Sequence, residues 1–184
     1  MTFLTSIAEN GVLLDVFKAF PAAARPLIMY HEVVMRGPSP LTVAERELIA
    51  AYVSGLNACT YCHGIHTITA QTFGVPEQLV QALLQDLETA LVEEKLRPLL
   101  RIVRRLTALP SRLVQADIDT VRDAGWNDAA LHDAVAVCAL FNFMNRYVEG
   151  LGLSADEGYF QVAGHRIHDV GYAGLLRLLP QSEG

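Results

Sequence analysis

The longest stretch of the sequence without Asp, Glu, Lys or Arg runs from Leu48 to Pro76. Ser54, Asn57, His66 and several threonines interrupt its apolar residues. These side chains make the stretch too polar for the roughly 20 residues of hydrocarbon that a membrane span requires. We therefore predict that it lies in the interior of a folded protein, and we expect no membrane partner.

Helix signals recur along the whole chain. The capping-box pattern Ser/Thr-x-x-Glu, which marks helix N-termini, begins at Ser6, Thr42 and Ser154. No long stretch alternates apolar and polar residues with the period of a strand, so we predict an all-α fold. We expect Pro98 to break or kink the helix that contains it. The expected helices span residues 6–19, 22–35, 42–54, 58–73, 76–88, 90–107, 115–124, 128–149 and 155–169.

Length and composition indicate one apolar domain. The chain has 184 residues, of which 52% are hydrophobic and 18% charged. We expect a single domain over residues 1–184, with its core motif at about 41–75. The low charged fraction suggests that part of the apolar surface lies at subunit interfaces of a homo-oligomer. The predicted helix over 128–149 is apolar on nearly every side from Ala134 to Phe143, as core and interface helices are. Its polar residues are interpreted as internal hydrogen-bonding groups: Asn142, Asn145 and Arg146.

The charge pattern disfavours nucleic acid as a partner. The formal net charge is −6, so the chain has no overall basic field. One cluster of arginines lies along a single stripe at helical spacing: Arg97, Arg101, Arg104 and Arg105. We interpret it as a solvated face toward a helix C-terminus. The first eleven residues contain neither the basic segment nor the long apolar segment of a secretory signal, so we expect a cytoplasmic location.

Two cysteines and two histidines lie within eight residues of one another in "NACTYCHGIHTITAQ". Asn57 is a good candidate for the N-cap of the helix that follows. Cys59 would then occupy the second helical position and Cys62 would lie one turn deeper. Unpaired N–H groups and the positive end of the helix dipole at this terminus would stabilise a thiolate. The third cysteine, Cys138, lies in "AVAVCALF" and is interpreted as an inert core residue.

The spacing of the cluster favours redox chemistry. Cys59 and Cys62 are three residues apart on one helix face, close enough for a disulfide. His66 lies four residues beyond Cys62, and His63 stands in the same relation to Cys59, so each imidazole can reach a thiol. Glu47 lies upstream among apolar neighbours, where an inward-facing carboxylate needs a polar partner. We expect the cysteine–histidine cluster to be that partner.

Three other interpretations of the cluster stay open. "CTYCH" matches the haem-attachment pattern Cys-x-x-Cys-His, although attachment takes place outside the reducing cytosol. Two cysteines with one or two histidines could bind zinc, although a zinc site usually draws its ligands from two segments. The cysteines could also be buried and inert. A redox-active dithiol is the interpretation that we favour, and we expect no resident metal or cofactor.

A longer pattern carries a resemblance to a known family. In "LTVAERELIAAYVSGLNACTYCHGIHTITAQTFGV", eleven residues separate Glu47 from Cys59, and Cys62 and His66 follow in register. This pattern resembles the alkylhydroperoxidase D (AhpD)-like group of the carboxymuconolactone decarboxylase superfamily. The later "GWNDAALHDAVAVCALFNFMNRYVEGLG" is similar to the peroxidase-related branch of that group. Tyr61, which stands where alkylhydroperoxidase D has a histidine, is also similar to that branch. The likeness covers residues from about 10 to 175.

The resemblance implies both a fold and an activity. It implies a multi-helix AhpD-like domain whose helices pack across the interfaces of a trimer or hexamer. The implied activity is reduction of a small hydroperoxide or of a disulfide. Cys62 would be the peroxidatic cysteine, and Cys59 its resolving partner, the more accessible to the reductant. Glu47 and His66 would form a proton relay, with Tyr61 and His63 as supporting residues. The external reductant would be a dithiol on a thioredoxin-like or lipoyl protein.

Two other functions remain possible from the sequence. A lyase of the decarboxylase type would use the histidine as a general acid or base on a lactone, although such relatives generally lack the cysteine pair. A non-catalytic redox sensor would use the disulfide only as a switch.

Overall fold

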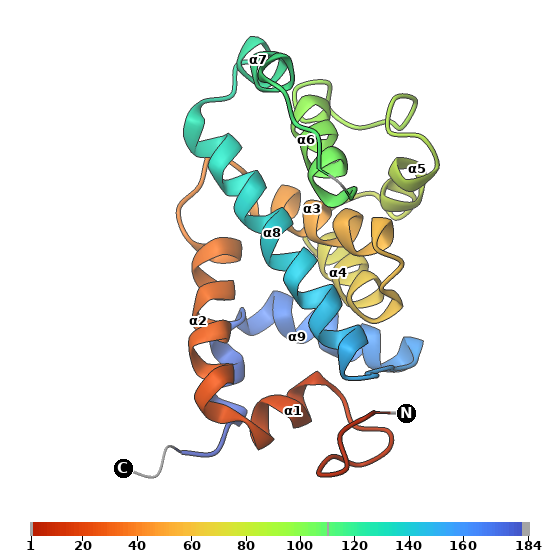
Figure 1. Ribbon diagram of the computed structural model, residues 1–184, viewed down its shortest axis with the longest axis vertical. Coiled ribbons are helices and arrows are strands. Elements are labelled where there is room, and N and C mark those ends of the chain that lie inside the picture. Colours follow the sequence, from red (N-terminus) through yellow and green to blue (C-terminus); the bar gives the residue numbers. More distant parts are fainter. Residues whose placement is uncertain (1, 110, 182–184) are drawn as a thin grey trace.

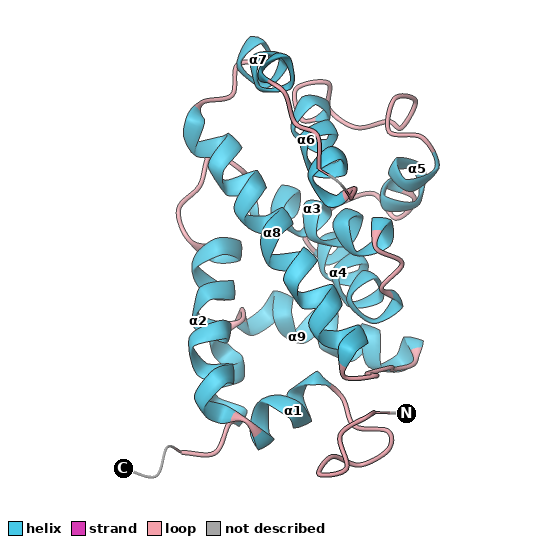
Figure 2. Cartoon of the chain, viewed as in Figure 1, coloured by secondary structure: helices cyan, strands magenta, loops and turns pink. Residues whose placement is uncertain are grey.

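The computed structural model describes residues 2–109 and 111–181, and within them the chain forms helices joined by loops, with no strand (Figure 2). The all-α prediction is confirmed. The helices are α1 (Leu13–Ala19), α2 (Pro21–Arg36), α3 (Val43–Leu56), α4 (Thr60–Thr72), α5 (Leu79–Gln85), α6 (Arg97–Thr107), α7 (Gln115–Asp123), α8 (Asp128–Gly150), α9 (Glu157–Val170) and the 3₁₀ helix η1 (Ala173–Leu178).

The charge-free stretch forms the centre of the molecule, as predicted. Residues 48–53 of α3 are buried, each at most 2% exposed. Helix α3 packs against α4 and α8, and α9 covers another side of α4 (Figure 1). Because the segment carries no charge, these helices meet without burying an unpaired ion.

The starts of the helices test the capping predictions. The Thr42 box is confirmed, because its hydroxyl accepts from the Glu45 N–H at 3.1 Å and the Glu45 carboxylate accepts from the Thr42 N–H. The boxes at Ser6 and Ser154 were wrong predictions: α1 begins only at Leu13, and α9 is capped by Asp156. A carboxylate directly before the first turn satisfies the free N–H groups better than a hydroxyl two residues upstream.

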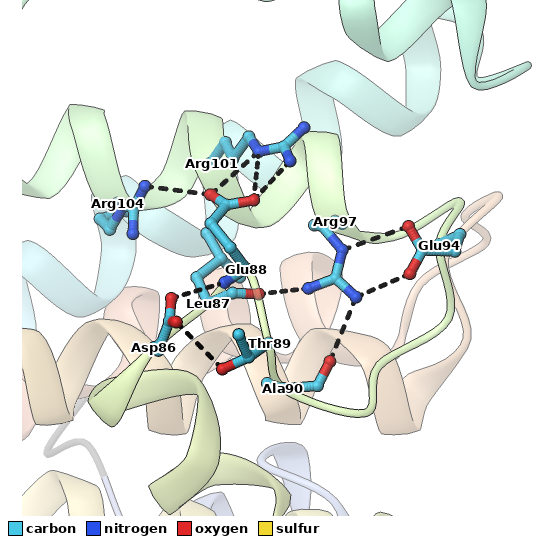
Figure 3. A network of polar contacts seen from close by, with 9 residues as sticks. All are labelled: Asp86, Leu87, Glu88, Thr89, Ala90, Glu94, Arg97, Arg101 and Arg104. Atoms are coloured by element: carbon cyan, nitrogen blue, oxygen red, sulfur yellow. Dashed lines mark hydrogen bonds and ion pairs between the residues drawn. The ribbon is translucent and has the colours of Figure 1, made fainter.

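Figure 3 shows why α6 begins at Arg97 and not near residue 90. The guanidinium of Arg97 donates to the carbonyls of Leu87 and Ala90 and pairs with Glu94, so it fastens the α5–α6 loop. Arg97 is therefore buried, and the interpretation of it as part of a solvated face was wrong. Pro98 falls in the first turn of α6, where proline has no needed N–H to lose, so it starts the helix and does not kink it.

Four helices end in the same backbone motif. After α4, α7 and α8, a glycine with positive φ follows the cap, at Gly74, Gly125 and Gly152. After α3 the equivalent residue is Ala58, with φ of 54°. The N–H groups of Ala58 and of the next residue, Cys59, bond back to carbonyls in the last turn of α3, as a Schellman motif requires. A left-handed alanine costs roughly 1 kcal/mol or more, and this strain lies at the entrance to α4.

Helix α8 buries most of its apolar segment inside this one chain. Ala134, Val137 and Phe141 are each at most 1% exposed. Asn142 and Asn145 accept hydrogen bonds from the Asn57 amide, so their interpretation as internal hydrogen-bonding residues is confirmed. The same interpretation of Arg146 was wrong, because its side chain is exposed and makes one long bond, to a carbonyl of its own helix.

The outer face of α2 is apolar although its inner face carries charges. Arg25, Glu32 and Arg36 all bond to groups of this chain. The exposed residues of the helix are uncharged: Ala22, Ala23, Pro26, Met29, Tyr30 and Val33. An exposed apolar helix face of this kind is typical of a surface that another protein covers. No described helix has the length and apolar character needed to cross a membrane.

Candidate active site

The turn between α3 and α4 sets the position of the first cysteine. Asn57 is the C-cap of α3 and not the N-cap of α4, which is Cys59 itself, so the predicted register was wrong by two residues. Two amide oxygens of α8, on Asn142 and Asn145, accept from the Asn57 Nδ2 group at 3.0 and 2.8 Å. The turn is thus fastened to α8, and its geometry is set by long-range contacts.

Both thiols are reduced and buried. Cys59 is 0% exposed and Cys62 is 4% exposed. The expectation that Cys59 is the more accessible of the pair therefore fails within a single copy of the chain. Hydrogen bonding between the two thiols lowers the pKa of Cys59 and, together with burial, raises the pKa of Cys62 well above its usual value. Cys59 is thus the more acidic sulfur.

Glu47 lies on α3 with its side chain completely buried beside α4. Its Oε2 accepts from His66 Nδ1 at 2.8 Å, so the predicted pairing with the histidine of the cluster is present. Its Oε1 is bound by Arg36 at 2.8 Å and by the Tyr172 hydroxyl at 3.0 Å. Three other elements, α2, α4 and the segment before η1, therefore converge on one carboxylate of α3.

Charge pairing outweighs burial at Glu47. Burial by itself would raise the pKa of this carboxyl, but the hydrogen bond and charge of His66 and the charge of Arg36 bring the pKa below its usual value. The group is ionised at neutral pH. Because a carboxylate only accepts hydrogen bonds, it holds the proton of His66 on Nδ1, and a neutral imidazole then has its free lone pair on Nε2. The Phe141 ring, 4.4 Å away and edge-on, fixes the plane of the His66 ring.

A cavity of about 80 Å³ opens beside Cys62 and His66. Its wall is mostly apolar and is built by α1, α2, α4, α8, α9 and η1. Of the two thiols, only Cys62 borders this cavity. The cavity therefore brings one sulfur and one imidazole of the predicted site together, with Glu47 directly behind the imidazole.

The two supporting residues lie in different surroundings. Tyr61 lines the cavity, where its hydroxyl accepts from the Leu13 N–H at 3.0 Å and lies 3.3 Å from the Tyr159 hydroxyl. Burial raises the pKa of Tyr61, so it stays a neutral phenol. His63 instead bonds to the Ala51 carbonyl at 3.0 Å on the flank of α3 and does not line the cavity.

His31 is a second imidazole in the cavity wall, and sequence reasoning missed it. Its Nδ1–H donates to the Leu27 carbonyl at 2.8 Å. Burial lowers the pKa of His31 to about 4, so the ring is neutral at pH 7. The partners Arg36 and Tyr172 of Glu47 were also missed, because only the fold brings α2 and residue 172 to α3. The one available signal was the basic and aromatic character of side chains on otherwise apolar segments.

The described residues contain no group of three or more His, Cys, Asp or Glu side chains placed to share a metal ion.

Comparison with known proteins agrees with this geometry. Residues 21–104 match the model of the carboxymuconolactone decarboxylase family, and this segment contains Glu47, both cysteines of the pair and His66. The predicted resemblance to this superfamily is confirmed. A comparison with curated proteins gave no match.

Comparison with solved structures shows that most of the chain has the AhpD-like fold. An uncharacterized peroxidase-related protein from Silicibacter sp. TM1040 is 25% identical, with a TM-score of 0.74 over 80% of this chain and 78% of that one. A second peroxidase-related protein with an alkylhydroperoxidase AhpD core, from Ralstonia eutropha JMP134, is 23% identical, with a TM-score of 0.73 over 81% and 78%. The debrominase Bmp8, solved with 2,3,4-tribromopyrrole, has the same fold at 15% identity, with a TM-score of 0.70 over 85% and 81%.

Proposed function

We propose that this AhpD-like protein is a thiol-dependent peroxidase that uses Cys62 and Cys59 as its redox pair. The observation that carries the proposal is the cavity wall, where the Cys62 thiol and the His66 imidazole border the same space and Glu47 holds His66 in one tautomer. A thiol beside an oriented base is the arrangement that activates a nucleophile.

The first half of the reaction consumes the hydroperoxide. The Cys62 proton passes to Nε2 of His66, and the thiolate attacks the distal oxygen of ROOH. The O–O bond breaks, an S–O bond forms, and the departing alkoxide takes the proton from His66 to leave as ROH. Cys62 is then a sulfenic acid, oxidised by two electrons. Glu47 stays ionised throughout, because its pKa is already low.

The second half restores the thiols. Cys59, the more acidic sulfur, attacks the Cys62 sulfenic acid, so an S–S bond forms and the oxygen leaves as water with the thiol proton. An external dithiol then reduces this disulfide by exchange and is itself oxidised. Because both sulfurs are nearly inaccessible to solvent, this exchange requires the α3–α4 turn to move, and the left-handed Ala58 in that turn is a strained point at which it can open.

A lyase or a redox sensor makes different use of the same groups. A lyase needs only His66 and Glu47, so a Cys59→Ser/Cys62→Ser double variant would keep full activity on a lactone substrate. A sensor reacts once with peroxide and has no steady turnover when a recycling dithiol is supplied. A peroxidase loses all activity in the double variant and turns over as long as dithiol is present.

We also propose that the protein works as a homo-oligomer. The support for an interface is the uncharged outer face of α2, where Tyr30 is 52% exposed and Val33 64% exposed. The segment of α8 from which the sequence suggested an interface is mostly buried within one chain, so it no longer supports the idea. Light scattering that gave a 20.1 kDa particle at micromolar concentration would rule the oligomer out.

The experiment that tests the peroxidase assignment is sulfenic-acid trapping with dimedone. After one equivalent of cumene hydroperoxide, Cys59→Ser is expected to carry the label on Cys62. Cys62→Ser is expected to carry none. Wild type is expected to form the Cys59–Cys62 disulfide and leave Cys138 alkylatable. Label on Cys59 in the Cys62→Ser variant would make Cys59, the more acidic sulfur, the attacked residue and would overturn the assignment.

A further inference from the structure

The polar groups of the cavity are nearly all neutral or already bonded. Tyr61 bonds to Leu13 and Tyr159, and the Tyr172 hydroxyl donates to Glu47. His31 donates to Leu27. His66 is held by Glu47. Each of these groups has a partner in the chain, so a ligand in the depth of the cavity meets a surface without free charge.

Arg166 is different from the other residues of the wall. It lies on α9 on the same face as Tyr159, Ala163 and Ile167, which also line the cavity. Its guanidinium makes no hydrogen bond or ion pair with the described residues, although it is close enough to Tyr159 for its charge to act on that phenol. Asp15, the acid that also acts on Tyr159, bonds to the Val12 N–H and pairs with Lys18.

We propose that Arg166 selects ligands that have an apolar body and a carboxylate at one end. The body would enter the apolar cavity toward Cys62, and the carboxylate would stay with the half-buried Arg166. The proposal deepens the peroxidase assignment, since it names the substrate class as hydroperoxides of small carboxylic acids. The binding part of it does not depend on peroxide chemistry.

The charge distribution supports this orientation. A carboxylate that entered the depth of the cavity would lose its hydration without finding an unpaired cation, because Arg36 is taken by Glu47 and His31 is uncharged. Arginine, in contrast, offers a planar fork of N–H donors that fits a carboxylate with two bonds. A cavity of about 80 Å³ can enclose only a small apolar group, so the part of the ligand that it buries is compact.

The direct test is binding of an unreactive probe. Wild type is expected to bind 4-isopropylbenzoate about tenfold more tightly than 4-isopropylbenzamide, which has the same shape and no charge, in NMR titrations at low salt. Arg166→Gln is expected to remove this preference, and Arg166→Lys to keep part of it. Arg146→Gln is the matched control, because Arg146 is an exposed arginine of α8 that does not line the cavity, and it is expected to behave as wild type.

Two results would overturn the proposal. Equal binding of acid and amide by wild type would do so even if the Arg166 variants failed to fold. A preference for the acid that survives in Arg166→Gln would assign the carboxylate to another group.

A kinetic arm separates this proposal from the peroxidase assignment. If both hold, wild type reduces 4-(2-hydroperoxypropan-2-yl)benzoate with about tenfold higher kcat/KM than its methyl ester, and Arg166→Gln loses the difference. If neither hydroperoxide is reduced while the benzoate still binds through Arg166, the peroxidase assignment fails and the binding site stands.

Discussion

Two glutamates in this protein are each held by two basic side chains, and the contrast between them shows what burial does to the same chemistry. Glu88 receives Arg101 and Arg104 in the network of Figure 3, where its side chain is 44% exposed. Glu47 receives Arg36 and His66 and is 0% exposed. Water screens the charges of the Glu88 cluster, so its ion pairs hold a loop in place and contribute little to stability. The second cluster sits in a low-dielectric core, where a charge must be paired and can therefore control a proton on its partner.

The largest expected difference is in stability when one cation is removed. Arg36→Met leaves the Glu47 charge buried with only His66 and Tyr172 beside it, so we expect a loss of about 3–5 kcal/mol in the free energy of unfolding. Arg101→Met, the matched change at Glu88, is expected to cost less than about 1 kcal/mol. Urea unfolding of both variants measures this. Equal losses would mean that burial does not separate the two clusters.

The pH dependence of the free energy of unfolding should come from the buried groups around Glu47 and not from the exposed cluster at Glu88. The folded-state pKa of His31 is about 4, below its usual 6.5, so the unfolded chain binds more protons between these values. Stability is then complete above pH 6.5 and falls by about 3 kcal/mol as the pH drops to 4, from about 1.4 kcal/mol per pKa unit. His31→Gln is expected to flatten this slope in urea titrations from pH 7 to pH 4. An unchanged slope in that variant would assign the proton uptake to other groups.

The turn that leads into the buried site carries strain that no turn in the Glu88 network shows. Ala58 has a φ of 54°, in the left-handed region that favours glycine. Ala58→Gly is expected to raise the free energy of unfolding by about 0.5–1 kcal/mol, because relief of the left-handed strain exceeds the added chain entropy of glycine. Thermal unfolding measures the gain. A lower melting temperature would show that the Cβ of Ala58 makes contacts worth more than the strain.

The smallest effect is expected when the exposed Glu88 loses its charge. Glu88→Gln should lower the free energy of unfolding by less than about 1 kcal/mol, because the cluster is exposed. Salt screens exposed charges, so the loss should be smaller still in 0.5 M salt. The measurement is urea unfolding at two salt concentrations. A loss of several kcal/mol that persists in salt would place Glu88 in the same class as Glu47.

The sequence predicted the features that depend on local patterns and missed those that depend on contacts between distant segments. Helix caps and the absence of strand-like alternation led to the all-α fold. The charge-free segment led to the buried core, and Glu47 just before it led to the Glu47–His66 pairing. Each of these signals is local in the sequence. The position of Cys59 at the N-cap was not predictable in this way, since Ala58 takes a conformation for which glycine is the usual signal. Arg36, Tyr172 and His31 could not be assigned, because their role depends on how α2 and the C-terminal segment pack on α3.

The arginine stripe on α6 shows where a local pattern gives a wrong prediction. Arg101 and Arg104 have solvent-exposed side chains, as helical periodicity predicts, but Arg97 on the same stripe is buried by a loop that wraps over it. Periodicity describes the helix alone, whereas the carbonyls of Leu87 and Ala90 reach Arg97 only through the path of that loop.

In the proposed mechanism the buried Glu47 acts on the Cys62 thiol through His66, and the rate of thiol oxidation measures that effect. Stopped-flow mixing of the reduced protein with cumene hydroperoxide should show oxidation slowed about 10²–10⁴-fold in Glu47→Gln. In Glu88→Gln the rate should equal that of wild type. The circular dichroism spectrum of each variant checks that it is folded. A folded Glu47→Gln protein that reacts as fast as wild type, with the same dependence on pH, would show that Glu47 does not control the thiol.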